Sequence, residues 1–487
     1  MSGEAGASAS GAGNGHGLRA RLGLRAATAL NITDMVGVGP FLTLPLIVAA
    51  MGGPPAVLAW VAGGVIAVCD ALVWAELAAS FPRAGGTYAY LGEMFGPRWG
   101  RLLSFLFAAQ LLVSAPLSMA SGCIGAGKYL GYVAPGLERT LAAPMGRLWV
   151  FGWVQVPLDI SGTSLAAAVA AVVATVLVYR RVEAVGKLAQ WLAAGVLGAL
   201  GVMIVAGLLH FHPALLRGSS AGAWGWHGLR SALPAGLLLA LYDLWGYYNV
   251  AFLGEEVERP ERNIPRAMLW AIGIVTVLYI LMNVSVLGVL PWQEVAGTQA
   301  TERLDVAALF IERLYGRTAG EGMAWLVVWT ALASVFALLT GYSRIVFAAA
   351  RDGNLPRGLA KLNAKGGFPG RAVMLLAAVT VAFCFVRVGE VIAALVVIRL
   401  VMQFGLQAVG LLWLRKSRPE VRRPFRMWLY PVPALVAMAG FGLVLADKAA
   451  LLARGALLGA VVAALFFVRA RKRREWPFET AAERVER

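Results

Sequence analysis

An aspartate and a glycine-rich segment interrupt the first long apolar run of the chain. Residues 26–51 could cross a bilayer, since a spanning helix needs roughly 20 apolar residues. The run nevertheless contains Asp34, Gly37, Gly39 and Pro40. An acid is costly at that depth, and the glycines and proline weaken the helix. Backbone freed there is tolerated only where it faces protein or a water-filled cavity. The segment therefore predicts two half-helices meeting at a binding site, or a kink that only eases helix packing.

A second apolar run, residues 231–254, is interrupted in the same way. It contains Tyr242, Asp243 and Gly246 in its middle. Gly37 and Gly246 lie roughly 209 residues apart (246 minus 37), and paired breaks of this kind indicate a secondary transporter built from inverted repeats. The pairing favours the first interpretation, in which both breaks line one site in the middle of the membrane.

The composition is that of a polytopic membrane protein. The 487 residues are 59% hydrophobic and 14% charged, with a mean hydropathy of +0.72, whereas soluble proteins have about 25% charged residues. About twelve spans are predicted, near residues 26–51, 54–80, 99–126, 162–180, 188–209, 231–256, 267–290, 323–350, 371–387, 389–414, 428–446 and 449–469. The predicted organisation is a disordered cytoplasmic tail (1–25), a first repeat with helices 1–5 (26–209), a second repeat with helices 6–10 (231–414), helices 11 and 12 (428–469) and a basic cytoplasmic tail (470–487).

Basic residues are distributed unevenly over the predicted loops. The formal net charge is +17. Of the 43 Lys and Arg, roughly 31 fall in the amino-terminal tail and in the loops on the same side of the membrane as that tail. About 11 fall in the loops on the opposite side. The positive-inside rule then predicts a multi-pass protein of the cell (inner) membrane, with the bilayer as its partner and both termini in the cytoplasm. Nucleic acid is not a predicted partner, because basic stripes with interleaved aromatic residues are missing.

The sequence lacks the residue spacing of a metal site or an enzyme. Its three cysteines and four histidines form no spaced cluster, so no metal, cofactor or disulfide framework is predicted. No nucleophile with a neighbouring base is evident, and the chain is not predicted to be an enzyme.

Four polar residues in the predicted spans are candidates for gating or coupling. Asp70 and Glu76 lie near the inner half of the second span, where acids are functional candidates by default. Glu76, with Arg83 nearby, is more simply a structural ion pair or helix-end contact. Arg399 is the deep arginine, and two glutamines follow it at helical spacing on the same expected face, for packing or for transport. Ser334 offers a hydroxyl, which also bonds harmlessly to its own helix, so no Na⁺ site is predicted.

Several separately spaced motifs resemble those of one family. The first is Gly37-Val-Gly39-Pro-Phe41, and the second combines Ala75-Glu76-Leu with Pro82-Arg83-Ala-Gly85-Gly86. The others are Glu255-Glu256-Val through Pro260, Ile264-Pro265-Arg266-Ala267, and Ser343-Arg344 through Arg351-Asp352-Gly353-Asn-Leu-Pro356. Over residues 26–414 the chain resembles the amino acid–polyamine–organocation (APC) superfamily of permeases. The resemblance implies an all-α, leucine-transporter-like bundle of five plus five inverted helices, with two additional C-terminal helices.

The resemblance also implies roles at individual positions. Gly37, Val38 and Gly39 would offer backbone amides to a substrate carboxylate, as a half-helix amino terminus favours anions. Tyr242 falls where the family places an aromatic gate. The backbone of Gly246, Tyr247 and Tyr248 would be unwound, with carbonyls that suit a substrate ammonium.

The chain departs from the family pattern at two places. Pro40 removes an amide where many amino acid permeases have an aliphatic residue, which resembles the polyamine-transporting branch. The middle of the fifth span, about residues 192–204, lacks the lysine that some proton-coupled members use.

Three roles are open for the two acids at the breaks. Asp34 and Asp243 could bind a cationic head group, carry a coupling proton, or pair with a buried donor such as Arg399. The predicted function is import of amino acids by alternating access, with protons as the coupling ion and cationic or polar substrates favoured. The alternatives are a polyamine transporter of the same fold and, in another class, a non-transporting membrane sensor or scaffold.

Overall fold

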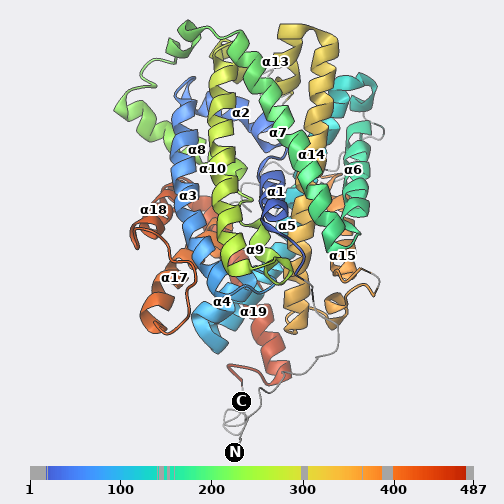
Figure 1. Cartoon of the computed structure of the whole chain (residues 1–487), viewed down its shortest axis with the longest axis vertical. Coiled ribbons are helices and arrows are strands. Elements are labelled where there is room, and N and C mark those ends of the chain that lie inside the picture. The colour runs from blue at the N-terminus through green and yellow to red at the C-terminus, as the bar shows by residue number, and fades with distance from the viewer. Residues whose placement is uncertain are drawn as a thin grey trace, which may run out of the picture.

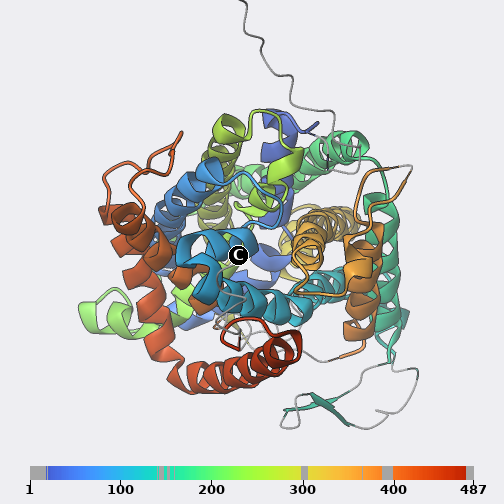
Figure 2. The same cartoon turned by 90° about the horizontal axis from the view of Figure 1, so that it is seen from below.

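The protein is a bundle of helices that run mostly along one long axis (Figure 1). The structure is a computed structural model that describes residues 18, 20–139, 141, 147–150, 154–157, 160–297, 305–364, 366–386, 397 and 399–478. Within these residues the chain is almost entirely helical, which confirms the predicted fold class. The strands β1 (Arg147–Val150) and β2 (Val154–Pro157) form one antiparallel pair, with Arg147 opposite Pro157. This pair lies at the rim of the bundle (Figure 2).

The helices of the first half begin close to the amino terminus. They are α1 (Leu24–Met35), α2 (Gly39–Met51), α3 (Ala56–Ser80), α4 (Thr87–Phe95), the π-helical turn η1 (Gly96–Gly100), α5 (Arg101–Val133), the 3-10 turn η2 (Pro135–Glu138), α6 (Gly162–Val178), α7 (Val182–Leu209) and the 3-10 turn η3 (Pro213–Arg217). Residues 1–17, most of the predicted disordered tail, lie outside the described residues. Leu22, inside that tail, is buried and its amide donates to the Glu256 carbonyl (2.9 Å).

The second half of the described chain also consists of helices and short helical turns. They are α8 (Trp226–Leu244), α9 (Asn249–Phe252), the 3-10 turn η4 (Gly254–Glu256), α10 (Pro260–Leu287), α11 (Trp292–Ala296), α13 (Val306–Tyr315), α14 (Arg317–Arg351), the 3-10 turn η5 (Arg357–Ala360), α15 (Gly370–Phe383), the π-helical turn η6 (Leu400–Gly405) and α17 (Leu406–Ser417). The last two helices, α18 (Val432–Asp447) and α19 (Ala449–Arg473), follow the rim of the bundle (Figure 2). The repeat boundaries themselves stay predictions.

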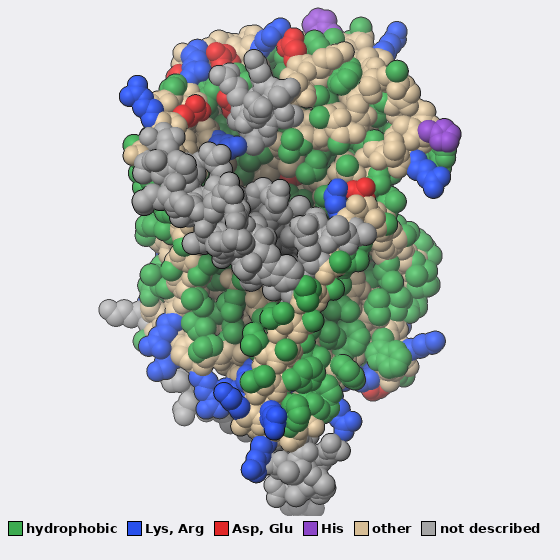
Figure 3. Space-filling model, turned by 180° about the vertical axis from the view of Figure 1, so that it is seen from behind, with side chains coloured by type: hydrophobic (Ala, Val, Ile, Leu, Met, Phe, Trp, Pro, Cys, Tyr) green, Lys and Arg blue, Asp and Glu red, His purple; other side chains and the backbone are tan. Residues whose placement is uncertain are grey.

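Helices occupy each of the twelve predicted spans, although the tenth is described only in part. In the described residues, α3, α4 with α5, α7, α10 and α14 are long and apolar enough to cross a membrane, and the bent pair α1 and α2 would add a sixth span. The other predicted spans hold helices that are shorter, interrupted or incompletely described. Figure 3 shows hydrophobic side chains over the middle of one face of the bundle, with Lys and Arg toward both of its ends.

Both predicted breaks are present and lie against each other. The axes of α1 and α2 differ by 46° across the break after Met35, and four residues separate the end of α8 at Leu244 from the start of α9 at Asn249. The hydroxyl of Tyr279 in α10 donates to the Met35 carbonyl (2.8 Å) and lies 3.5 Å from the Asp243 carbonyl. The hydroxyl of one tyrosine therefore contacts a main-chain carbonyl at each helix end, where the last carbonyls have no hydrogen-bond partner within the helix.

Candidate functional site

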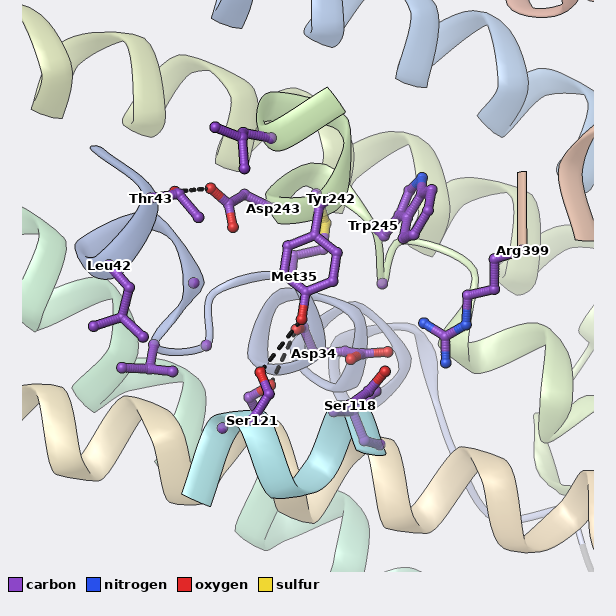
Figure 4. A pocket seen from close by; sticks show the side chains of 18 of the residues that line it. Asp34, Met35, Leu42, Thr43, Ser118, Ser121, Tyr242, Asp243, Trp245 and Arg399 are labelled. Carbon is purple, nitrogen blue, oxygen red and sulfur yellow. Dashed lines mark hydrogen bonds between the residues drawn. The ribbon is translucent and has the colours of Figure 1, made fainter. Parts of the chain in front are cut away.

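The two breaks line a cavity of about 410 Å³ in the middle of the bundle (Figure 4). Its walls come from α1, α2, α5, α8 and α14, with Arg399 beside them. The predicted site residues that it brings together are Asp34, Gly37, Val38, Gly39, Tyr242, Asp243, Gly246, Tyr248, Ser334 and Arg399. Leu46 and Leu238 extend the lining along α2 and α8, away from the end of the bundle where α1 begins and α19 ends, here named the termini end.

Glycines allow the chain to approach itself closely at this site. A Cβ on Gly37 would lie 2.8 Å from Ser334 Oγ, and one on Gly39 would lie 2.4 Å from Asp243 Oδ1. The amides of Gly37 and Val38 donate no hydrogen bond to the described part of the chain. They stand just before the first turn of α2, the positive end of a helix dipole. The segment is therefore suited to hold an anion.

The two acids at the breaks have different surroundings. Asp243 accepts a short hydrogen bond from the Thr43 hydroxyl, while its Oδ1 bonds no described residue and lies against Gly39. Asp34 is also buried, and its main-chain carbonyl accepts from Ser334 Oγ (3.3 Å). Both carboxylates stand near the carboxyl ends of α1 and α8, which are the negative ends of those helices. This side of the cavity is suited to a cation.

Arg399 places a positive charge on the same cavity. Its Nη2 donates to the Tyr342 hydroxyl (2.7 Å), and its Nε donates to no described residue. Arg399 and Asp34 interact electrostatically, but no ion pair within 4.0 Å joins them among the described residues. Figure 4 shows both side chains at the same cavity wall. The guanidinium therefore retains capacity for a further acceptor.

The stretch after Arg399 differs from the predicted regular helix. The π-helical turn η6 follows directly. Gln403 and Gln407 are both fully buried, yet only Arg399 of the three lines the cavity. All three side chains are buried, as the predicted polar stripe facing the bundle requires.

Aromatic rings pack beneath the cavity on the side of the termini end. Tyr248 stacks on Trp74 of α3, with ring centroids 4.6 Å apart, and Trp245 stacks on Phe404 at 4.8 Å. At the other wall, the Tyr242 hydroxyl lies 3.4 Å from Ser121 Oγ. Tyr242 thus connects α8 with α5 across the cavity. The stacked rings separate the cavity from the termini end.

Two predicted residues lie outside the cavity and contact each other. The Tyr247 hydroxyl donates to Asp70 Oδ2 (2.5 Å), so its side chain points toward α3. Asp70 is fully buried, its Oδ1 bonds no described residue, and no Lys or Arg of the described chain pairs with it. The buried Asp70 carboxylate, which pairs with no cation of the described chain, therefore holds Tyr247, the residue that follows Gly246.

Glu76 is also outside the cavity, at the centre of an ion-pair cluster. The Arg415 guanidinium bonds both of its carboxylate oxygens, with Nε at 2.7 Å from Oε1, and the Met427 amide donates to Oε2 (2.7 Å). Arg83, the partner considered from the sequence, bonds Glu93 instead (3.0 Å). Long-range packing thus supplies a partner more than 300 residues away in the chain.

A second buried ion pair closes the termini end. Arg344 of α14 binds Glu256 in a bidentate manner, Nε to Oε1 at 2.6 Å and Nη2 to Oε2 at 2.9 Å, and each side chain is only 1% exposed. The Glu256 carbonyl also accepts from the amides of Arg21 and Leu22. Beside it, the Gly85 amide donates to the Phe252 carbonyl (3.0 Å). The segment after the second break therefore connects the amino terminus, the α3–α4 turn and α14.

Some cavity residues were not predicted from the sequence. They are Thr43, Ser118, Ser121, Trp245 and Tyr342. Tyr342 follows Ser334 by eight residues in α14, a helical spacing that was available as a signal. Thr43 and the two serines carry no such signal, because single hydroxyls are common in membrane helices.

Comparison with known proteins identifies the family of the chain. A model of the amino acid permease family matches residues 22–475. An uncharacterized transporter of Mycobacterium tuberculosis is 33% identical over 379 residues, covering 75% of this chain and 73% of that protein. The human cystine/glutamate transporter is 26% identical over 420 residues (86% of this chain, 78% of that one), and the human Asc-type amino acid transporter 1 is 26% identical over 436 residues (87% and 76%). The resemblance drawn from the motifs is confirmed, and the chain belongs to the amino acid permease family of the APC superfamily, as a multi-pass protein embedded in the membrane.

Proposed function

We propose that the protein is a secondary transporter that imports amino acids across the cell's inner membrane by alternating access. The observation that carries the proposal is that both helix breaks line one cavity of about 410 Å³, within the roughly 300–1,000 Å³ typical of ligand sites. The described residues close this cavity at the termini end and extend its lining toward the other end. The bias of Lys and Arg supports cytoplasmic termini.

The helix ends suggest how an amino acid would be oriented. Its carboxylate would accept from the amides of Gly37 and Val38 at the start of α2. Its ammonium would lie toward Asp34 and the carboxyl ends of α1 and α8. Opposite helix ends facing one cavity thus complement both charges of a zwitterion.

The charges of the cavity bear on the substrate class. Asp34 and Asp243 favour a cationic or polar side chain, but Arg399 opposes a second positive charge. Together the three groups favour a polar amino acid over a cationic one. A polyamine, which has no carboxylate for Arg399 or for the α2 amides, is disfavoured for the same reason.

Uptake into proteoliposomes tests this function. The purified protein, reconstituted with an imposed proton gradient, is expected to accumulate at least one radiolabelled polar amino acid, and neither its methyl ester nor putrescine should compete. Arg399→Gln should raise the substrate KM roughly 10- to 100-fold, because a hydrogen bond to a charged group contributes about 1.5–3 kcal/mol. Uptake of putrescine alone would indicate the polyamine transporter, and binding of amino acids without uptake would indicate a sensor.

The Asp70–Tyr247 contact supports a role for protons in the cycle. Asp70 joins α3 to Tyr247 within the second break, and gain of a proton removes the charge that the Tyr247 hydroxyl bonds. A charged hydrogen bond is roughly twice as strong as a neutral one. We infer that protonation of Asp70 releases the segment that must move when the termini end opens.

Asp70→Asn is expected to abolish the stimulation of uptake by an inward proton gradient, while exchange of labelled for unlabelled substrate persists. Tyr247→Phe keeps the acid and should retain proton stimulation at a lower rate. Glu312→Gln is a matched control, since it removes another carboxylate that accepts from a tyrosine, Tyr132, away from the breaks. Proton stimulation that survives in Asp70→Asn, or is lost equally in Glu312→Gln, would contradict the assignment.

A further inference from the structure

A groove with a volume of about 750 Å³ lies at the termini end, outside the transport cavity. One wall is the first part of α10, with Arg262, Arg266 and Trp270. The other wall is the segment between α17 and α18, with Phe425 and Trp428. None of these side chains takes part in the proposed transport site.

The groove carries an excess of positive charge. Arg262 and Arg266 are exposed, and neither is paired with a carboxylate of the described chain. Glu261 also lines the groove, but it already pairs with Arg422 (Nη2 to Oε2, 3.4 Å). A guanidinium presents a planar set of donors that matches phosphate oxygens. Two free guanidinium groups one helical turn apart are therefore suited to one phosphate group.

The same face of α10 changes in character along its length. Arg262, Arg266 and Trp270 follow at intervals of four residues, so they share one side of the helix. That side continues with exposed aliphatic side chains. These are Ile274, Val277 and Leu281, which are 37%, 56% and 39% exposed. The order from charged to aromatic to aliphatic is the order of headgroup, interface and acyl chain in one leaflet.

Two tryptophans stand at the boundary between these zones. Trp270 is 62% exposed and Trp428, from the opposite wall, is 61% exposed. Tryptophan is enriched at the headgroup level of membranes because its ring is amphipathic. The groove therefore has an opening toward the lipid, with cations at its polar end.

We propose that this groove binds one anionic phospholipid from the leaflet at the termini end. Its phosphate is held by Arg262 and Arg266, its glycerol region lies between Trp270 and Trp428, and an acyl chain follows the aliphatic part of α10. The occupant is argued from charge complementarity and from the order of zones along one helix. The bound lipid would join α10 to the α17–α18 segment.

The test is binding of lipid to the purified full-length protein in detergent, followed by native mass spectrometry and thermal unfolding. Phosphatidylglycerol and phosphatidylcholine with identical acyl chains are the probes. The wild type is expected to bind phosphatidylglycerol at least tenfold more tightly. Arg262→Gln/Arg266→Gln should weaken phosphatidylglycerol binding about 30-fold, at about fivefold per arginine, and leave phosphatidylcholine unchanged.

A matched control separates this groove from a generally basic membrane surface. Arg180→Gln/Arg181→Gln removes two exposed arginines from the turn between α6 and α7 and should retain phosphatidylglycerol binding. Equal binding of both lipids by the wild type, or equal loss in both double variants, would overturn the proposal. So would displacement of phosphatidylglycerol by millimolar inorganic phosphate, which would indicate a site for the free anion. If the glutamine variant does not fold, Arg262→Lys/Arg266→Lys carries the test, with a smaller loss expected because the planar fork is removed.

Discussion

Replacing Gly246 by alanine is expected to abolish transport and to lower the stability of the protein by about 2–6 kcal/mol. Gly246 has a φ of +116°, a conformation that L-residues rarely adopt. An added Cβ would lie 2.7 Å from the Met35 amide nitrogen and 2.9 Å from the Asp34 carbonyl carbon. Both contacts are to backbone, which cannot move aside as a flexible side chain can. The two helix breaks would be forced apart at the cavity.

The measurements are uptake into proteoliposomes and equilibrium unfolding in detergent. Gly273→Ala is the matched control, because this glycine lies inside α10 and a Cβ there would meet no atom within 4 Å. In a helix interior alanine is favoured over glycine by about 1 kcal/mol, so the control should be neutral or slightly more stable. Full transport by Gly246→Ala would show that the close approach of the breaks is not needed.

Glu256→Gln is expected to cost about 3–5 kcal/mol of unfolding free energy, because it leaves Arg344 buried without a counter-charge. The two side chains are each 1% exposed, so water cannot replace the lost partner. The pair connects α14 to the segment after the second break, and its loss should also lower the uptake rate by releasing the termini end. Glu256→Met/Arg344→Met, which removes both charges, should recover much of the stability.

The neighbouring pair provides the control. Glu255 binds Arg351 at 2.8 Å, but these side chains are 25% and 36% exposed, so Glu255→Gln should cost no more than about 1 kcal/mol. Equal costs in the two variants would contradict the role given to burial.

The two predictions concern different parts of the proposed cycle. Gly246 keeps the breaks in contact, which forms the cavity. The Glu256–Arg344 pair holds the termini end closed below it. A transporter that works by alternating access must keep the contact between the two breaks and release the Glu256–Arg344 ion pair. Gly246→Ala is therefore expected to remove binding, whereas Glu256→Gln should retain binding while changing the rate.

Local sequence was sufficient to predict the class of the protein and the position of both breaks. Hydrophobic runs of span length identify membrane helices because the bilayer requires them, and glycine, proline and aspartate inside such runs weaken a helix wherever they occur. Gly37 and Gly246 were found in this way, since each acts through its own backbone. The acids Asp34 and Asp243 were found because a charge in an apolar run is costly and conspicuous.

Only the tertiary structure decided which partner each polar group has. Glu76 binds Arg415 rather than Arg83, Asp70 accepts from Tyr247, and Arg399 turns toward the cavity. These contacts join helices that lie far apart in the chain, and helix packing in a membrane is selected by shape and hydrogen bonding that a linear pattern does not contain. Arg399, Gln403 and Gln407 are all buried, but only Arg399 lines the cavity, and spacing alone did not distinguish the three. The sequence thus determined where the membrane helices break, while packing determined what each charged side chain meets there.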